Sequence, residues 1–318
     1  MNRIILFLKG MAMGAADVVP GVSGGTIAFI TGIYEELLHS IKSVSAHTFK
    51  VLFQEGLPAA WRQINGTFLI ILLAGIATSV LSLAKGLNHL LETQPILIWS
   101  FFFGLIVASA LLIGKSVKQW QPGTIIALLI GLGIAYYITV ATPAQTSEAA
   151  WFVFLSGALA ICAMILPGIS GSFILLLLGK YKFIIEALSE FKVQVILIFI
   201  LGCATGLLTF ARLLSWMFKH YHNLTIALLT GFMIGSLNKV WPWKKVVEWG
   251  TDRHGEAIPL VEKSILPTTY GELPPEALHS ASNDPQWVWA LVAALAGFAI
   301  IWVLERSSAN SGDTSNKD

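Results

Sequence analysis

Charged residues are scarce in this chain. Asp, Glu, Lys and Arg make up only 12% of its 318 residues, while 55% are hydrophobic and the mean hydropathy is +0.74. Soluble domains carry roughly a quarter charged residues, so this composition argues against an ordinary soluble protein and indicates an integral membrane protein. The net charge is +2 and no basic stripe alternates with polar surface, so no nucleic-acid partner is expected.

Cysteine is almost absent as well. Cys162 and Cys203 both lie within apolar runs, and neither has a histidine or second cysteine at metal-ligand spacing. We therefore expect small core or lipid-facing residues there, and we predict no metal and no cofactor. The N-terminus has only a short apolar run before Lys9 and no cleavage site, so it is expected to remain as the first membrane segment.

Long apolar runs account for the hydrophobic composition. A helix needs about 20 apolar residues to cross a bilayer, and six runs qualify. The six long runs are 67–85, 95–114, 123–142, 193–212, 223–239 and 286–304. Four shorter runs, 4–19, 24–37, 151–166 and 171–188, stand in pairs around two Pro-Gly breaks. The predicted fold is an all-α integral membrane protein with six full transmembrane helices and two broken or re-entrant helical hairpins.

The two breaks are copies of one motif. Pro-Gly-x-Ser-Gly begins at Pro20 and again at Pro167, and in both copies seven further residues precede Gly-x-Tyr, at a constant offset of 147. Proline interrupts a helix and glycine allows a sharp turn, so each motif should end one helix and begin another. Ser23 and Ser170 are the expected N-caps. Apolar sequence on both sides places this broken backbone at membrane depth.

The repeat extends beyond the motif. Residues 75–85 align with 202–212 at an offset of 127. Each half holds one paired break and three spans, so an odd number of crossings separates the halves and the second must be inverted, as in many transporters. The predicted organisation has three parts. These are a first repeat at 1–145 with its hairpin around Pro20–Gly25, a second at 146–306 with its hairpin around Pro167–Gly171 and a polar loop at 242–285, and a disordered tail at 307–318.

Helix starts at the two breaks are candidate anion sites. Backbone amides and the positive end of the helix dipole would face the membrane interior there, although the glycines could instead merely allow close helix packing. The candidate substrate-binding residues are Asp17, Pro20, Gly21, Ser23, Gly24, Gly25 and Thr26 in the first copy, and Pro167, Gly168, Ser170, Gly171 and Ser172 in the second.

Three charged residues complete the candidate site. Asp17 stands among Ala, Val and Gly, where an ionisable group is costly, and its partner could be Lys9 or the amides that follow the first break. A structural cap is the alternative role. Lys85 and Arg212 end matching spans, so inversion would place one cation toward each face of the membrane. Either side chain could simply reach for the interface instead.

Three segments carry a family resemblance. They are ADVVPGVSGGTIAFITGIYEELL at 16–38, LPGISGSFILLLLGKY at 166–181 and GFMIGSLNKVWP at 231–242. Together they resemble the bacterial polyprenyl-phosphate transporter family, PopT. The resemblance implies transport of undecaprenyl phosphate, the lipid carrier for peptidoglycan and other envelope polymers, back across the cytoplasmic membrane. The second copy departs from the first, with Ser172-Phe173 where the first has Gly25-Thr26, so equal roles are not expected.

The resemblance and the residues agree on an anionic lipid substrate. Moving its head toward a negative interior is uphill, which favours coupling to a proton or sodium ion, with Asp17 the first candidate. The excess of Lys and Arg on one side predicts cytoplasmic N- and C-termini. One alternative is an enzyme similar to the undecaprenyl pyrophosphate phosphatases, but Gly24 and Gly171 stand where the phosphate-clamping arginine would be. Another alternative is a small-anion transporter or channel. The sequence predicts no particular oligomeric state.

Overall fold

Helices form most of the chain. The computed structural model describes residues 2–18, 23–144, 146–251, 257–278 and 282–313. The helices of the first half are α1 (Arg3–Val18), α2 (Gly24–Ile30), α3 (Tyr34–Ser43), α4 (Ala46–Glu55), α5 (Leu57–Gln63), α6 (Gly66–Thr93), α7 (Pro95–Lys115) and α8 (Pro122–Val140). The second half contains α9 (Ala150–Ile165), α10 (Gly171–Leu177), α11 (Tyr181–Ser189), α12 (Val193–His220), α13 (His222–Ser236) and α15 (Trp287–Asp313).

Helix boundaries reproduce the two sequence offsets. α1 and α9 each have 16 residues, α2 and α10 each have 7, and both pairs begin and end 147 positions apart. α6 and α12 each have 28 residues and begin and end 127 positions apart. Gly32 and Gly179, again 147 apart, end the two short helices with positive φ angles of 71° and 62°. Glycine adopts this backbone conformation without a steric penalty, so both short helices stop at the same point.

Equivalent helices also pack in equivalent pairs. α1 lies along α6 as α9 lies along α12, while α7 packs on α15 and α8 on α13. A Cβ atom on Gly75 would lie 2.3 Å from the carbonyl oxygen of Phe7, and one on Gly202 would lie 2.0 Å from that of Phe154. Small residues let membrane helices approach closely, and here they do so at matching positions of the two halves.

In the part of the chain that the structure describes, four helices are long and apolar enough to cross a membrane. They are α6, in its part Gly66–Leu83, together with α7, α8 and α12. The other two predicted spans correspond to α13, which has 15 residues, and to the apolar part of α15, Trp287–Val303. The structure is therefore a mostly helical membrane protein with four clear candidate spans and several shorter apolar helices.

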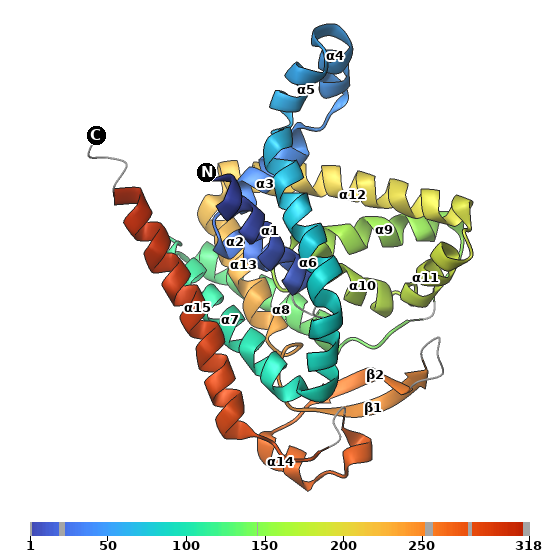
Figure 1. Ribbon diagram of the computed structural model, residues 1–318, viewed down its shortest axis with the longest axis vertical. Coiled ribbons are helices and arrows are strands. Elements are labelled where there is room, and N and C mark those ends of the chain that lie inside the picture. The colour runs from blue at the N-terminus through green and yellow to red at the C-terminus, as the bar shows by residue number, and fades with distance from the viewer. Residues whose placement is uncertain (1, 19–22, 145, 252–256, 279–281, 314–318) are drawn as a thin grey trace.

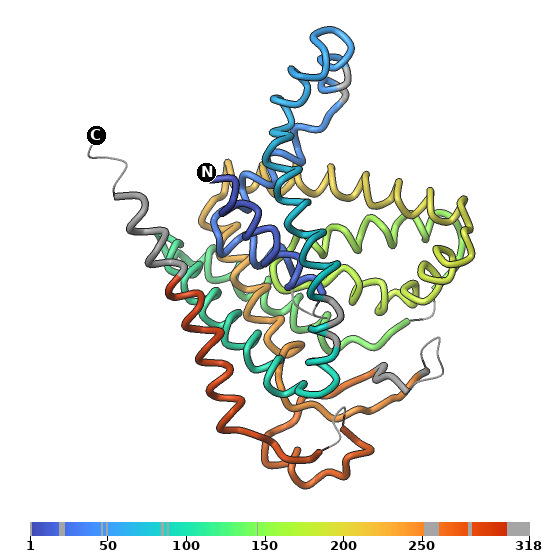
Figure 2. The backbone as a smooth tube through the Cα atoms, in the orientation of Figure 1, coloured from blue at the N-terminus to red at the C-terminus, as the bar shows by residue number. Residues whose placement is uncertain are grey.

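The polar loop contains an unpredicted antiparallel hairpin. β1 (Lys244–Thr251) pairs with β2 (Ala257–Ser264), Lys244 opposite Ser264, and α14 (Pro267–Glu272) and the short η1 (Pro275–Ala277) follow. In Figure 1 this hairpin and α14 lie at the opposite end of the molecule from the start of α1 and the end of α15. The backbone trace in Figure 2 shows the same separation.

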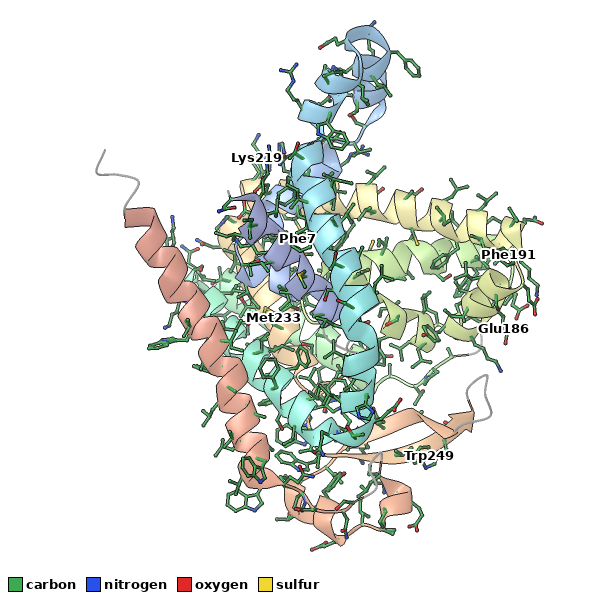
Figure 3. The ribbon with its side chains drawn as sticks, in the orientation of Figure 1. Phe7, Glu186, Phe191, Lys219, Met233 and Trp249 are labelled. Atoms are coloured by element: carbon green, nitrogen blue, oxygen red, sulfur yellow. The ribbon has the colours of Figure 1, made fainter. Side chains whose placement is uncertain are left out.

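Two other segments depart from what the sequence suggests. The connection between the first hairpin and α6 is folded into α3, α4 and α5, and the last two project from the body in Figure 1. α15 continues to Asp313, within the tail for which the sequence predicts disorder, and residues 314–318 lie outside the described part of the chain. In Figure 3, α12 runs from near Phe191 at the right edge of the molecule to Lys219, whose label lies near α1.

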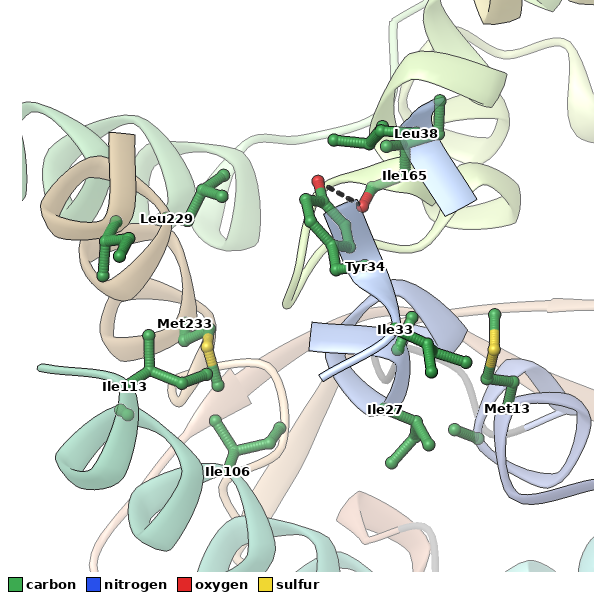
Figure 4. Packing of buried hydrophobic residues seen from close by; sticks show 14 of the residues in the cluster. Met13, Ile27, Ile33, Tyr34, Leu38, Ile106, Ile113, Ile165, Leu229 and Met233 are labelled. Atoms are coloured by element: carbon green, nitrogen blue, oxygen red, sulfur yellow. Dashed lines mark hydrogen bonds between the residues drawn. The ribbon is translucent and has the colours of Figure 1, made fainter. Parts of the chain in front are cut away.

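The core lies where the first hairpin meets the central helices. Buried side chains from α1, α2, α3, α7, α9 and α13 form one cluster, and Figure 4 shows part of it. Leu38 and Tyr34 are only 1% and 2% exposed. Burial of this apolar surface fixes the short helix α2, which is too short to be stable alone.

Candidate functional site

The two sequence breaks lie against each other. Ser23 Oγ, at the start of α2, donates a hydrogen bond to the carbonyl oxygen of Met164 at the end of α9, 2.9 Å away. A Cβ atom on Gly25 would lie 2.5 Å from the carbonyl oxygen of Ile165, so only glycine allows this approach. The motif residues of one half therefore contact the motif of the other.

A second hydrogen bond crosses the same junction. Thr26 is fully buried, and its Oγ1 accepts the backbone N–H of Gly168 at 2.9 Å. Gly168 has a φ of 89°, and a Cβ there would lie 2.5 Å from Ser236 Oγ. Glycine is thus required at this position by both backbone conformation and space.

The side chain of Asp17, from the end of α1, lies at the start of α2. Its Oδ1 accepts the backbone N–H of Gly24 at 2.6 Å, and a Cβ on Gly24 would lie 2.5 Å from its Oδ2. Of the two partners considered from the sequence, the structure shows the backbone amide. Lys9 instead donates through Nζ to the carbonyl oxygen of Thr31 at 2.6 Å. Carboxylates at helix N-termini are favourable because the dipole and the free amides are both positive.

Contrary to the sequence-based expectation, the amides of Gly24, Gly25 and Thr26 at the first break are not free. Besides the Gly24 amide held by Asp17, the Gly25 N–H donates to Ser23 Oγ at 3.1 Å and the Thr26 N–H donates to the Ser23 carbonyl at 2.9 Å. Ser23 is the N-cap of α2, as predicted. An anion can reach these amides only by replacing a protein group.

The second break is built differently. Ser170 is the N-cap of α10, as predicted, but its side chain caps no amide; its Oγ lies 2.8 Å from Ser172 Oγ instead. A Cβ on Gly171 would lie 2.6 Å from the carbonyl oxygen of Ala160, so this glycine allows α10 to pack on α9. Pro167 is buried beside Gly168, whereas Ser172 is exposed. Two neighbouring hydroxyls therefore mark this break, where the first has a carboxylate.

Tyr34 contributes to the junction of the two halves, although the sequence analysis did not include it among the candidate residues. Its hydroxyl donates to the carbonyl oxygen of Ile165 at 3.1 Å (Figure 4), so the first half holds the end of α9 from a second side. The repeated Gly-x-Tyr was the available signal. Its counterpart Tyr181 is 44% exposed, so the two tyrosines have different surroundings.

An apolar cavity adjoins the second break. It has a volume of about 340 Å³ and is lined by residues of α8, α9, α10, α12 and α13 together with Leu166 and Ile169 from the break itself. The lining is almost wholly hydrocarbon, so the cavity suits an alkyl or isoprenoid chain and no charged group.

Several predicted site residues lie away from the junction or outside the residues that the structure describes. Arg212 is exposed, and its Nη2 donates to the carbonyl oxygen of Val44 at 3.2 Å, beyond the end of α3. Lys85 belongs to α6, but its side chain lies outside the described residues. Pro20 and Gly21 also lie outside them.

Comparison with known proteins places the chain in a family. A family model described as undecaprenyl phosphate translocase-like matches residues 13–258. A protein named polyprenyl-phosphate transporter from Vibrio cholerae is 47% identical over 306 residues, 96% of this chain and 97% of that protein. One of the same name from Staphylococcus aureus is 32% identical over 256 residues, 75% of this chain and 86% of that protein. No solved structure matches the chain. With this extent of similarity, and with both copies of its motif joined at one site, the chain belongs to the undecaprenyl phosphate translocase-like family.

Proposed function

We propose that this chain moves undecaprenyl phosphate across the bacterial cytoplasmic membrane, returning the lipid carrier after it has delivered its cargo. Membership in a translocase-like family is the observation that carries this proposal. The family description and the names of both relatives denote transporters, so the chain is a transporter and not an enzyme such as the phosphatase considered above.

The proposed architecture is an inverted repeat of residues 1–145 and 146–306, with six crossings and two re-entrant hairpins. Equal helix lengths at constant offsets and matching glycine contacts support it. Hairpins entering from opposite faces would meet at their tips near the midplane, where such transporters bind substrate. Cytoplasmic termini are proposed from the distribution of Lys and Arg.

The phosphate head is proposed to bind where the two hairpins meet, at the residues of the two motifs. The contact between Asp17 and the Gly24 amide supports this, because that position already accepts a negatively charged oxygen. An arriving phosphate would compete with the carboxylate of Asp17. The hydroxyls of Ser170 and Ser172 are further donors, and the apolar cavity beside them suits the first isoprene units. Lys85 and Arg212 are proposed to attract the head at the two ends of its path.

Coupling to a cation is proposed because inward movement of the head is uphill. The membrane potential costs about 2.3 kcal/mol per charge per 100 mV. Protonation of Asp17 would release the Gly24 amide to the phosphate and would also carry a positive charge along the same path. Proton binding and substrate binding would then favour each other at one helix start.

Leaflet exchange of labelled undecaprenyl phosphate in proteoliposomes tests the function directly. The wild-type protein should accelerate exchange, and an imposed proton or sodium gradient should change its rate. Ser23→Ala, Asp17→Asn and Arg212→Ala should slow it, whereas Ser189→Ala, an exposed serine on α11, should not. Equal rates in all four variants would remove the proposed site while leaving the function itself intact.

Two further measurements separate the alternatives. Phosphate released from undecaprenyl pyrophosphate would indicate the enzyme, and uptake of inorganic phosphate into empty liposomes would indicate the small-anion transporter. Neither activity is expected, and either one without lipid exchange would overturn the proposed function.

A further inference from the structure

Two lysines and one glutamate form a charged cluster between the β hairpin and the membrane helices. Lys239 Nζ, after the end of α13, and Lys244 Nζ, at the start of β1, both lie 3.6 Å from the same oxygen, Oε2 of Glu262 on β2. Lys244 Nζ also donates to the carbonyl oxygen of Lys239 at 2.7 Å. The side chains are 19%, 7% and 16% exposed in the order Lys239, Lys244 and Glu262.

Aromatic rings connect this cluster to the membrane helices. Lys239 Nζ lies 4.5 Å from the ring centroid of Phe173, and Lys244 Nζ lies 4.2 Å from that of Trp99 on α7. Phe173 belongs to α10 and follows the Ser170–Ser172 hydroxyl pair directly in the chain. The cluster therefore brings positive charge from the hairpin side of the molecule to the second break.

Among the residues that the structure describes, the charges of the cluster do not balance. Two ammonium groups share one carboxylate oxygen, so the protonated trio carries one surplus positive charge in a poorly hydrated place. A phosphate monoester carries between one and two negative charges near pH 7 and has three acceptor oxygens, so it neutralises two lysines better than a single carboxylate does. Lys239 is the more exposed lysine and is the one an arriving anion would meet first.

We propose that Lys239 and Lys244 form a receiving site for the phosphate monoester head of a polyprenyl lipid, and that Glu262 occupies the site as a counterion that the phosphate displaces. This inference rests on the proposed function, since it supplies that function with an entry site on the hairpin side. From Lys239 the head passes along Phe173 to the hydroxyls of the second break. The segment GFMIGSLNKVWP at 231–242 would thereby supply Lys239 to the entry site for the phosphate head.

Equilibrium binding of radiolabelled farnesyl phosphate to the full-length protein in detergent tests the site. Lys239→Gln should weaken binding about tenfold, the size of a lost charged contact of about 1.4 kcal/mol. Lys239→Arg should restore most of it. Glu262→Gln should strengthen binding, because it removes the competing anion. Lys263→Gln is the matched control, because this lysine follows Glu262 on β2 but is exposed.

The opposite effects expected of Lys239→Gln and Glu262→Gln on binding distinguish a receiving site from a purely structural ion cluster. If Lys239→Gln and Glu262→Gln both weaken binding, or both leave it unchanged, the proposal fails. Should Glu262→Gln not fold, the two Lys239 variants decide alone, and unchanged binding in Lys239→Gln overturns the site. Competition by farnesol or by inorganic phosphate equal to that by farnesyl phosphate would also overturn the assignment to a lipid phosphate. If these binding results are obtained but the wild-type protein does not accelerate exchange of undecaprenyl phosphate in proteoliposomes, the proposed function fails instead.

Discussion

The two breaks share a motif but differ in what fills them. At the first break, the carboxylate of Asp17 accepts the Gly24 amide. Ser23 and Thr26 are buried there and form hydrogen bonds to the other half. At the second, Met164 replaces the aspartate, Ser172 is exposed, and the Lys239 cluster lies nearby. One copy thus carries a carboxylate and the other adjoins two lysines. The two breaks therefore share their helix boundaries but differ in their charged neighbours.

Replacing the carboxylate should have the largest effect on this comparison. Asp17→Asn removes the negative charge that holds the Gly24 amide and the proposed proton carrier, so lipid exchange in proteoliposomes should fall at least tenfold. Met164→Leu, at the equivalent position of the second copy, should leave exchange unchanged. Equal losses in both variants would mean that the two breaks do not differ in charge-dependent function.

Breaking the contact between the copies should cost stability. Thr26→Val keeps the shape but leaves the buried Gly168 amide without its acceptor, which should lower the free energy of unfolding by about 1–3 kcal/mol. Ser172→Ala, one residue before the position that corresponds to Thr26 in the second copy, changes an exposed hydroxyl and should cost much less. Thermal unfolding in detergent measures both, and a harmless Thr26→Val would show that the junction does not depend on this bond.

The positive side of the comparison predicts a pH dependence. Burial lowers the pKa of the Lys244 ammonium to about 8, with Lys239 adding to the effect and Glu262 opposing it. The unfolded chain keeps a pKa near 10.5 and therefore binds more protons between these values, so the free energy of unfolding rises with pH above 8, by about 1.4 kcal/mol per unit. Relative to Lys244→Met, the wild-type protein should gain thermal stability from pH 7 to pH 9. A constant difference would contradict the lowered pKa.

The smallest expected effect separates the two tyrosines. Tyr34→Phe removes the bond to the Ile165 carbonyl and should cost about 1 kcal/mol in unfolding free energy. Tyr181→Phe should cost nearly nothing, because Tyr181 is half-exposed. Equal melting temperatures for both variants would show that the motif tyrosines stabilise the halves alike.

Sequence reasoning reached the membrane class, the two breaks and the N-cap positions because these depend on local chemistry and on regular spacing. It could not show that Thr26 bonds Gly168 or that Asp17 holds Gly24, since such pairings depend on tertiary contact. The prediction of free amides was wrong for Gly24, Gly25 and Thr26, because the side chains of Asp17 and Ser23 and the Ser23 carbonyl accept their N–H groups. The β hairpin was missed because its strands lie in a polar segment, where a period-two pattern is weak.

The seven-residue length of α2 and α10 has a consequence for how the protein is made. A helix of two turns has no stability of its own, and α2 is held in part by the C-terminal end of α9 and by Gly168, which the ribosome delivers more than a hundred residues later. During synthesis the membrane must therefore carry a first half in which α2 lacks its bonds to α9 and Gly168, and a chain truncated before residue 164 would never supply them. Separate expression of the two halves should leave each unstable and prone to proteolysis, and their co-expression should rescue both.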